Sequence, residues 1–176
     1  MAESDIEFAL PDAAATDVLG AALGCALPGG TLAGAQGDYL VLYLHGELGA
    51  GKTACVRSLL RACGVTGLIR SPTFTLVEAY RTDRLTCVHV DLYRLRGPLE
   101  VDELGLRDYL IPGCLLMIEW PEKATAGLPP ADVKLTLQYA SSGRCATAHA
   151  RTKLGSEWLR NLRMDTRLGP YVSNLT

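Results

Sequence analysis

Eight consecutive residues fit G-x-x-x-x-G-K-[ST], the pattern of a phosphate-binding loop. They are Gly46-Glu47-Leu48-Gly49-Ala50-Gly51-Lys52-Thr53. Glycines in this pattern let backbone amides approach phosphate oxygens closely, and the start of a following helix adds a positive partial charge. We therefore expect Lys52 to reach the terminal phosphates and the Thr53 hydroxyl to bind magnesium.

Two acidic residues end apolar segments later in the chain. Asp91 follows residues 86–90, and Glu119 follows residues 114–118. A protein that cleaves a nucleotide on such a loop needs a carboxylate near the metal and a group that orients the attacking water. Both groups usually lie at the C-terminal ends of strands beside the loop. Glu119 ends the more apolar segment and most resembles a Walker B acid, although one strand-end acid alone is often only solvated.

Four further features have both a functional and a structural interpretation. The hydroxyls of residues 71–75 (Ser-Pro-Thr-Phe-Thr) can sense a γ-phosphate, or they belong to an ordinary turn. Trp120 stacks on a base or a partner, or packs in the core. Arg94 contacts phosphate or a partner, or is solvated. His89 is better explained as a histidine of the sheet or core than as a functional group.

The segments around these residues alternate between strand and helix patterns. Residues 39–45 predict a strand before the loop, and residues 54–63 predict a helix after it. The other predicted elements are an edge strand (6–10), a helix (12–27), a hairpin (76–80 and 85–90), short helices broken near Gly105 (98–110), a buried strand (114–118), a second hairpin (133–139 and 145–150) and a C-terminal helix (155–164). This order predicts an α/β fold: a P-loop NTPase-like three-layer sandwich with a mixed central sheet and β-hairpins.

Composition limits the classes of function. The chain has 176 residues, 48% of them hydrophobic, and a formal net charge of −2, so bulk charge does not indicate a large nucleic-acid surface. The six cysteines form no C-x-x-C pair, so zinc-ligand spacing is absent. We find no signal-peptide pattern and no apolar run near the length of a membrane span. We therefore expect a reduced cytoplasmic protein that does not associate with membranes.

Several segments taken together resemble one family, the bacterial ATPase TsaE (also called YjeE), which takes part in making the threonylcarbamoyladenosine modification of tRNA. Many families share the loop, but its combination with S-P-T-F, H-x-D-L-Y-R and I-E-W-P-E is specific. The resemblance extends over roughly residues 6–150. The matching segments, in the order of the family, are residues 16–20, 46–53, 71–77, 89–94, 103–106 and 118–122.

The resemblance implies ATP and Mg²⁺ as cofactors. It implies that Lys52 and Thr53 bind phosphate and magnesium and that Asp91 helps to hold the magnesium. It implies that Glu119 supports hydrolysis as a metal-linked or water-orienting acid. Thr73 is implied to act near the γ-phosphate.

The resemblance also implies positions for the nucleotide and the partners. Thr16 matches a position near the adenine, and Trp120 lies near the nucleotide. The partners are TsaD and TsaB, and tRNA is reached indirectly because TsaD transfers the threonylcarbamoyl group. We expect a P-loop ATPase domain over residues 1–154 and a helix and tail extension over 155–176, whose last dozen residues form a loose tail. The glycine-rich connection over 28–38 also departs from the family pattern.

Three alternatives are weighed against this ATPase. A small-molecule or nucleoside kinase on a P-loop fold would need a basic lid over its acceptor, and no Arg-rich lid segment is evident. A nucleotide-binding switch that works only by docking would bind ATP without turnover. A GTPase is disfavoured because the sequence has no N-K-x-D segment to read guanine.

Overall fold

Seven strands form one mixed sheet in the order β1-β7-β6-β2-β5-β4-β3. The computed structural model describes residues 5–29, 39–72, 74–97, 99–124 and 126–173, so Thr73 and most of the predicted 28–38 connection lie outside the described residues. The strands are β1 (Ile6–Leu10), β2 (Leu40–His45), β3 (Val77–Arg81), β4 (Thr86–Asp91), β5 (Cys114–Glu119), β6 (Val133–Tyr139) and β7 (Arg144–Ala150).

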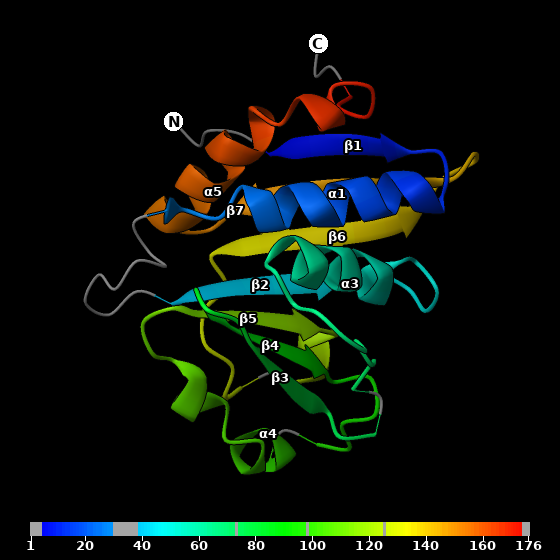
Figure 1. Cartoon of the computed structure of the whole chain (residues 1–176). Helices are drawn as coiled ribbons and strands as arrows, with labels where there is room; N and C mark the ends of the chain where they lie inside the picture. Colours follow the sequence, from blue (N-terminus) through cyan, green and yellow to red (C-terminus); the bar gives the residue numbers. More distant parts are fainter. Residues whose placement is uncertain (1–4, 30–38, 73, 98, 125, 174–176) are drawn as a thin grey trace.

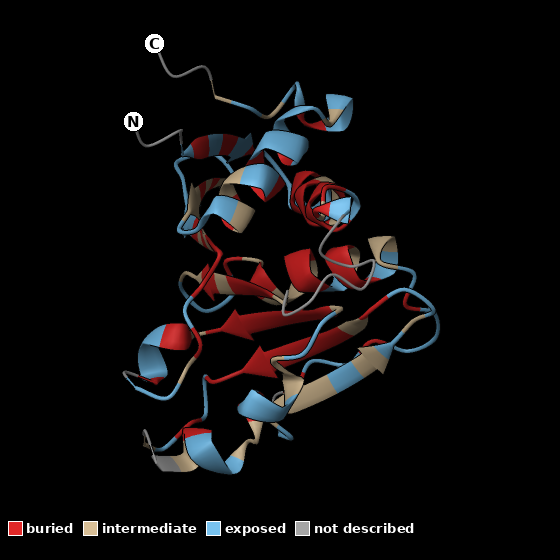
Figure 2. Ribbon diagram, turned by 90° about the vertical axis from the view of Figure 1, so that its left-hand side faces the viewer, coloured by how far each residue is buried: buried red, intermediate tan, exposed pale blue. Residues whose placement is uncertain are grey.

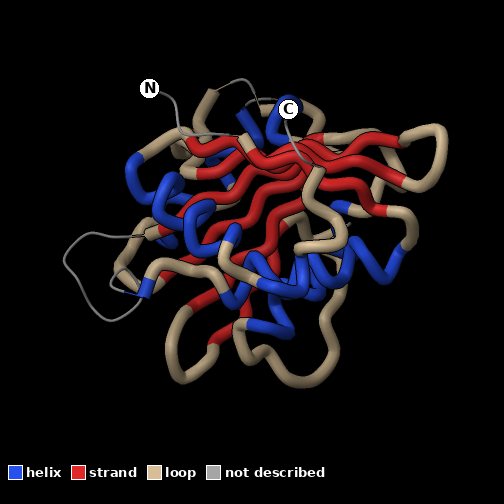
Figure 3. Tube along the Cα trace, turned by 90° about the horizontal axis from the view of Figure 1, so that it is seen from above, coloured by secondary structure: helices blue, strands red, loops and turns tan. Residues whose placement is uncertain are grey.

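The four inner strands β6, β2, β5 and β4 run parallel, while β7 and β3 run antiparallel to them and β1 pairs antiparallel with β7. Of the three antiparallel pairs among the described strands, β3/β4 and β6/β7 are the predicted hairpins, and the third is β1/β7. The strands fan out when the sheet is viewed from above (Figure 3), as the right-handed twist of strands requires. The sheet therefore brings the C-terminal ends of β2, β4 and β5 to one edge.

Helices and short helical turns cover both faces of the sheet (Figure 1). The α-helices are α1 (Ala13–Cys25), α3 (Lys52–Ala62), α4 (Leu99–Glu103) and α5 (Lys153–Arg163), and the 3-10 turns are η1 (Leu106–Tyr109), η2 (Pro121–Lys123) and η3 (Thr166–Leu168). The helices α1, α3 and α5 share one apolar core with the sheet, and α4 and η1 share a second core on the other face. Figure 2 shows buried strands between these layers. The predicted α/β sandwich is confirmed.

Alternation along the inner strands decides which side chains reach each layer. In β5, Leu115 and Met117 belong to the core beneath α1 and α3, while Leu116 and Ile118 belong to the other core. Because strand side chains alternate with a period of two, Glu119 points toward the layer of α1 and α3. The same alternation in β4 sends His89 and Asp91 to that layer.

Helices α1 and α3 pack in close contact because α1 has glycine where they cross. A Cβ atom built on Gly20 would lie 2.2 Å from the carbonyl oxygen of Cys55, and one on Gly24 would lie 2.7 Å from that of Leu59. Real Cβ atoms do not approach backbone oxygens so closely. This contact fixes α1 beside the first turns of α3, and therefore beside the phosphate-binding loop.

The C-terminal segment packs on the main core, and the expectation of a loose tail over the last dozen residues is wrong for its described part. Trp158 in α5 is fully buried, and its Nε1 donates to the Leu23 carbonyl at 2.9 Å. Further on, Leu168 is buried and the Tyr171 carbonyl accepts a hydrogen bond from the Ala9 amide at 2.7 Å. Backbone pairing with β1 ties down a segment that has few apolar residues of its own. The predicted boundary after residue 154 stays a prediction.

No helix among the described residues is long and apolar enough to cross a bilayer.

Candidate functional site

The phosphate-binding loop joins the C-terminal end of β2 to the first turn of α3. Gly46 has φ 135°, and a Cβ atom there would lie 2.1 Å from the Leu137 carbonyl oxygen on β6. Gly51 has φ 107° at the N-cap of α3, a conformation that side chains rarely adopt. The helix therefore starts at Lys52, inside the motif and two residues earlier than predicted, which directs the N-terminus of α3 into the loop.

Lys52 is buried and faces the loop. Its Nζ donates to the carbonyl oxygens of Gly46 at 2.6 Å and Glu47 at 2.9 Å, and lies 3.8 Å from the centroid of the Trp120 ring. Burial lowers the pKa of Lys52, while the negative charges of Glu119, Glu122 and Asp91 act in the opposite direction. A buried ammonium held by weak acceptors is suited to bind a phosphate, which is a stronger acceptor.

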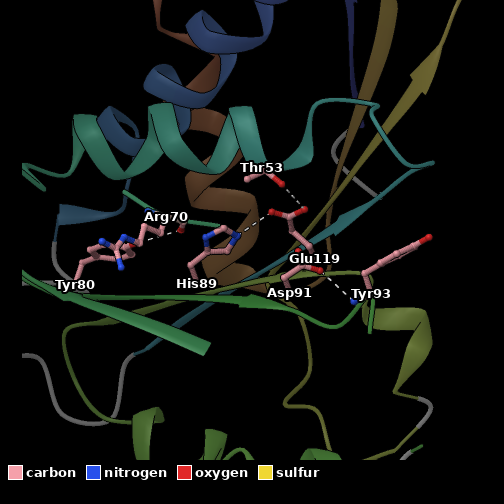
Figure 4. A network of polar contacts seen from close by, with 7 residues as sticks. All are labelled: Thr53, Arg70, Tyr80, His89, Asp91, Tyr93 and Glu119. Carbon is pink, nitrogen blue, oxygen red and sulfur yellow. Dashed lines mark hydrogen bonds and ion pairs between the residues drawn. The ribbon is translucent and has the colours of Figure 1, made fainter. Parts of the chain in front are cut away.

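The two predicted acids lie side by side. Asp91 and Glu119 are register partners at the ends of the parallel strands β4 and β5, and both are buried. Thr53 Oγ1 donates to Glu119 Oε2 at 3.0 Å, and Asp91 Oδ1 accepts the backbone N–H of Tyr93 at 3.0 Å (Figure 4). Burial raises the pKa of Asp91, and the charge of Glu119 adds to that effect.

These oxygens form a donor set suited to a magnesium ion that also binds phosphate. Magnesium in nucleotide sites commonly takes one or two carboxylates, phosphate oxygens and water rather than a complete protein cage. The described residues accordingly contain no group of three or more His, Cys, Asp or Glu side chains able to hold a metal by themselves. Thr53, Asp91 and Glu119 fit magnesium together with a nucleotide.

A cavity of about 430 Å³ lies over these groups, between the loop and the ends of β4 and β5. Its size is in the range of small-ligand sites. The residues that line it are Leu48, Gly49, Gly51, Lys52, Thr53, Ala54, Ser71, Asp91, Tyr93, Arg94, Glu119 and Trp120. The structure thus brings most of the predicted site residues to one cavity.

Backbone strain is found at Trp120, which lines this cavity, and at Leu76, whose carbonyl accepts a hydrogen bond from the Asp91 N–H. Among the described non-glycine residues, positive φ angles occur at Leu76 (61°) and Trp120 (59°). Such angles cost about 1–3 kcal/mol and collect at functional sites. The strained backbone of Trp120 aims its ring over Lys52, and the Tyr93 ring lies 5.0 Å from it. Trp120 therefore combines partial packing on the second core with direct contact to the loop.

The segment that carries Ser71 is fastened at both ends. Before it, the Tyr80 hydroxyl bonds both the N–H and the carbonyl of Arg70 at 3.2 Å (Figure 4). After it, the Leu76 carbonyl accepts the Asp91 N–H at 3.0 Å. Between these ties Phe74 is 85% exposed, and the Arg94 guanidinium lies 4.6 Å from the centre of its ring. The segment thus borders the cavity without being part of the core.

A family model described as "Threonylcarbamoyl adenosine biosynthesis protein TsaE" matches residues 10–146. This chain belongs to the TsaE family. The match covers more than half of the chain and includes the loop, both acids and Trp120, and it confirms the resemblance inferred from the motifs. The TsaE family acts in the biosynthesis of threonylcarbamoyladenosine in tRNA.

Named relatives and a solved structure agree with this assignment. The TsaE protein of Haemophilus influenzae is 41% identical over 116 residues, which cover 66% of this chain and 73% of the relative. The TsaE protein of Synechocystis is 43% identical over 127 residues, 70% of this chain and 74% of the relative. The crystal structure of YdiB from Bacillus subtilis superimposes with a TM-score of 0.70 at 24% identity, covering 93% of this chain and 96% of that one, and it shows the fold alone.

This TsaE-family chain also has loop contacts that sequence reasoning did not predict. Tyr139 Oη donates to the Leu48 carbonyl at 3.0 Å, and Arg144 Nη2 lies 3.5 Å from the Gly49 carbonyl. Both come from the β6/β7 hairpin, whose alternation predicts strands but not their distance from the loop. A Cβ atom built on Gly51 would lie 3.2 Å from the methyl carbon of Thr16, so Thr16 on α1 lies close to the loop.

His89 was also assigned no function from the sequence. It is buried, as expected of a histidine in the sheet, but its Nε2 lies 2.8 Å from Glu119 Oε1. The signal that could have found this contact is the two-residue spacing from Asp91, which puts both side chains on one face of β4.

Proposed function

We propose that this TsaE-family chain binds ATP with Mg²⁺ and hydrolyses it slowly, and that hydrolysis supports turnover of the TsaD/TsaB transferase, which makes the threonylcarbamoyl modification of the adenosine next to the tRNA anticodon. The observation that carries the proposal is the Thr53–Glu119 hydrogen bond of 3.0 Å beside Asp91, opposite the buried Lys52, around one cavity. A hydroxyl, two strand-end acids and a loop lysine are the groups that phosphate cleavage on this fold requires.

Each group has a defined task in this proposal. Lys52 and the loop amides bind the β- and γ-phosphates. Thr53, Asp91 and Glu119 hold Mg²⁺, which when bound neutralises charge on the phosphate oxygens. Glu119 in addition orients the attacking water, because its buried carboxylate is an acceptor aimed at the cavity.

Three further residues are proposed to contact the nucleotide or respond to it. Thr16 lies near the adenine; its position close to Gly51 of the loop supports this placement. Thr73 acts near the γ-phosphate; the ties at Arg70 and Leu76 support it by holding its segment beside the cavity. The Trp120 ring lies over the Lys52 ammonium, so it responds when Lys52 neutralises the charge of a bound phosphate.

The proposed partners are proteins rather than bare tRNA. Tight binding to nucleic acid requires clustered Lys or Arg that neutralise several phosphates. The nearest cluster here, Arg81, Arg84, Arg94 and Arg96, is interleaved with acidic residues, and the net charge of the chain is −2. We infer that tRNA is reached through TsaD and that the chain docks on TsaD and TsaB in the cytoplasm, where tRNA is modified.

ATP hydrolysis by the chain alone and with purified TsaD and TsaB tests the proposal. We expect weak turnover alone and stimulation by the partners. Asp91→Ala and Glu119→Ala should fold, bind ADP and lose about 100-fold or more of the stimulated rate, because stabilisation of transition-state charge is worth several kcal/mol. Asp83→Ala, in the exposed turn of the β3/β4 hairpin, is the matched control.

Three outcomes would contradict the proposal. Turnover near wild type in both acid variants would remove the acids from catalysis. ATP binding without turnover in the full assembly would favour a docking switch. Phosphoryl transfer to a small acceptor, followed with γ-labelled ATP, would favour the kinase.

A further inference from the structure

Glu119 is a buried carboxylate that depends on hydrogen bonds. It is 2% exposed, and the ion pairs of the described residues include none between Glu119 and a lysine or arginine. Lys52 influences it only over a longer distance. A carboxylate withdrawn from water must have hydrogen-bond donors, or its burial becomes very costly. Thr53 donates to Oε2 at 3.0 Å, and His89 Nε2 lies 2.8 Å from Oε1.

His89 is oriented for this one contact. It is 1% exposed, and within the described structure its Nδ1 is buried without a hydrogen-bond partner. A proton on Nδ1 would therefore have no acceptor, so the geometry favours the tautomer with its proton on Nε2, donating to Glu119. An unsatisfied buried polar atom destabilises the fold, and an apolar side chain on β4 would avoid that cost. Packing alone therefore does not explain a histidine here.

Thr53 and His89, the two residues that contact Glu119, differ in their other roles. Thr53 belongs to the phosphate-binding loop and lines the cavity, so a nucleotide with its metal competes for its hydroxyl. His89 is not among the residues that line the cavity, and it lies on the rigid inner strand β4. When the Thr53 hydroxyl binds the nucleotide with its metal, His89 is the residue that still contacts Glu119.

We propose that His89 is a positioning residue for Glu119. Its Nε2–H holds Oε1, which fixes the rotation of the carboxylate and keeps Oε2 aimed at Thr53 and the cavity. This inference rests on the proposed function, since it assigns to Glu119 the task described above. His89 itself touches neither nucleotide nor water in this scheme; it acts through Glu119.

Four substitutions separate positioning from packing. His89→Leu removes the donor and keeps the volume. His89→Gln places an amide N–H near the position of Nε2, and His89→Asn is equally polar but too short to reach. His149→Leu is the matched control, a sheet histidine on β7 whose partner is Asp5 at the exposed edge.

Turnover in the presence of TsaD and TsaB, with nucleotide affinity from calorimetry, is the first readout. Loss of an outer partner of a ligating group typically costs about 10–100-fold. We expect His89→Leu and His89→Asn to lose turnover in that range with KM and ADP affinity nearly unchanged, and His89→Gln and His149→Leu to stay near wild type. Full turnover in His89→Leu, or a His89→Gln variant as slow as His89→Asn, would overturn the proposal.

A second readout needs neither nucleotide nor partner. Thermal unfolding of wild type, His89→Leu, Glu119→Gln and the double variant gives a double-mutant cycle. We expect the effects on Tm to be non-additive by about 2–4 °C, because His89→Leu takes one of two hydrogen-bond contacts from a buried carboxyl group only where Glu119 is present. If His89→Leu folds poorly, the same cycle is run with His89→Asn. Additive effects would show that His89 does not act on Glu119.

The two readouts also separate this inference from the proposed function. A wild-type chain that hydrolyses no ATP with its partners would overturn the proposed function, and with it the task given to Glu119. The Tm cycle would still decide whether His89 holds the carboxylate.

Discussion

The two sides of the cavity are built on opposite principles. Its polar floor consists of Thr53, Asp91 and Glu119, which line the cavity, with His89 behind Glu119. Short hydrogen bonds join these groups, and all of them except Thr53 are buried. Its apolar rim consists of Leu48 and Tyr93, which line the cavity, and of Phe74 on the segment that borders it. These side chains are 66%, 41% and 85% exposed, respectively.

Neither arrangement serves folding. Burying carboxylates costs free energy that only precise pairing offsets, and exposing large apolar side chains forgoes the gain from burying them. The floor is the arrangement expected for chemistry on a charged ligand, and the rim is the one expected for a surface that another molecule covers. Substitutions on the floor should therefore affect nucleotide binding and turnover, and substitutions on the rim should affect docking.

The largest expected effect comes from Lys52, which faces the floor. Lys52→Ala removes the ammonium that we expect to bind the β- and γ-phosphates. Hydrogen bonds to charged groups are worth about 1.5–3 kcal/mol each, so losing two of them lowers ATP affinity by about 100-fold or more. Isothermal titration calorimetry measures this directly, and stimulated ATPase activity should vanish as well.

Lys134→Ala is the matched control, because Lys134 lies on β6 and does not line the cavity. Unchanged ATP affinity in Lys52→Ala would contradict the assignment of the phosphate-binding loop. Equal losses in both variants would mean that overall charge, rather than the position of Lys52, supports binding.

A smaller effect of another kind is expected at the rim. Phe74→Ser should weaken docking to TsaD and TsaB by about tenfold or more, in line with truncation of an aromatic anchor. It should leave ATP affinity and Tm near wild type, because the ring is exposed and contacts Arg94 rather than the core. A pull-down with ATP analogue, ADP or no nucleotide measures docking, and we expect it to be strongest with the analogue.

Met164→Ser matches this substitution in exposure, since Met164 is 79% exposed and follows α5, away from the cavity. Loss of docking in both variants would point to a general apolar effect. If Phe74→Ser and the choice of nucleotide both leave docking unchanged, the rim is not the partner surface.

Local patterns predicted the floor far better than the rim or the tail. The loop, the strands before it and before each acid, and the helix predicted from residue 12 all depend on neighbouring residues, and the structure contains them. The two-residue spacing from Asp91 puts His89 on the same face of its strand, but it does not identify Glu119, thirty residues away, as the partner. The packing of the C-terminal segment likewise depends on β1 at the other end of the chain. Contacts between distant segments follow from strand order, which the sequence pattern leaves open.

The smallest expected effect tests whether the burial of Asp91 in the floor lowers the stability of the folded chain. Burial raises the pKa of Asp91 above its ordinary value of 3.8, so the folded chain binds this proton more tightly than the unfolded chain does. Stability must then fall as pH rises from that value through the raised pKa, and stay lower above it. Asp91→Asn lacks this penalty and can still accept the Tyr93 N–H, so we expect it to be more stable than wild type at pH 7.

The gain should be about 0.5–2 kcal/mol, within the range of stabilising changes at functional sites, or a few degrees in Tm at about 2–4 °C per kcal/mol. Thermal unfolding without nucleotide, repeated down to pH 3, measures it. The difference should shrink as pH falls, since below the ordinary pKa the carboxyl group is protonated in both states and resembles the amide. Asp83→Asn in the exposed hairpin turn should show no such gain. A destabilised Asp91→Asn at pH 7 would mean that Asp91 contributes to folding, and the contrast between floor and rim would then hold only for Glu119 and His89.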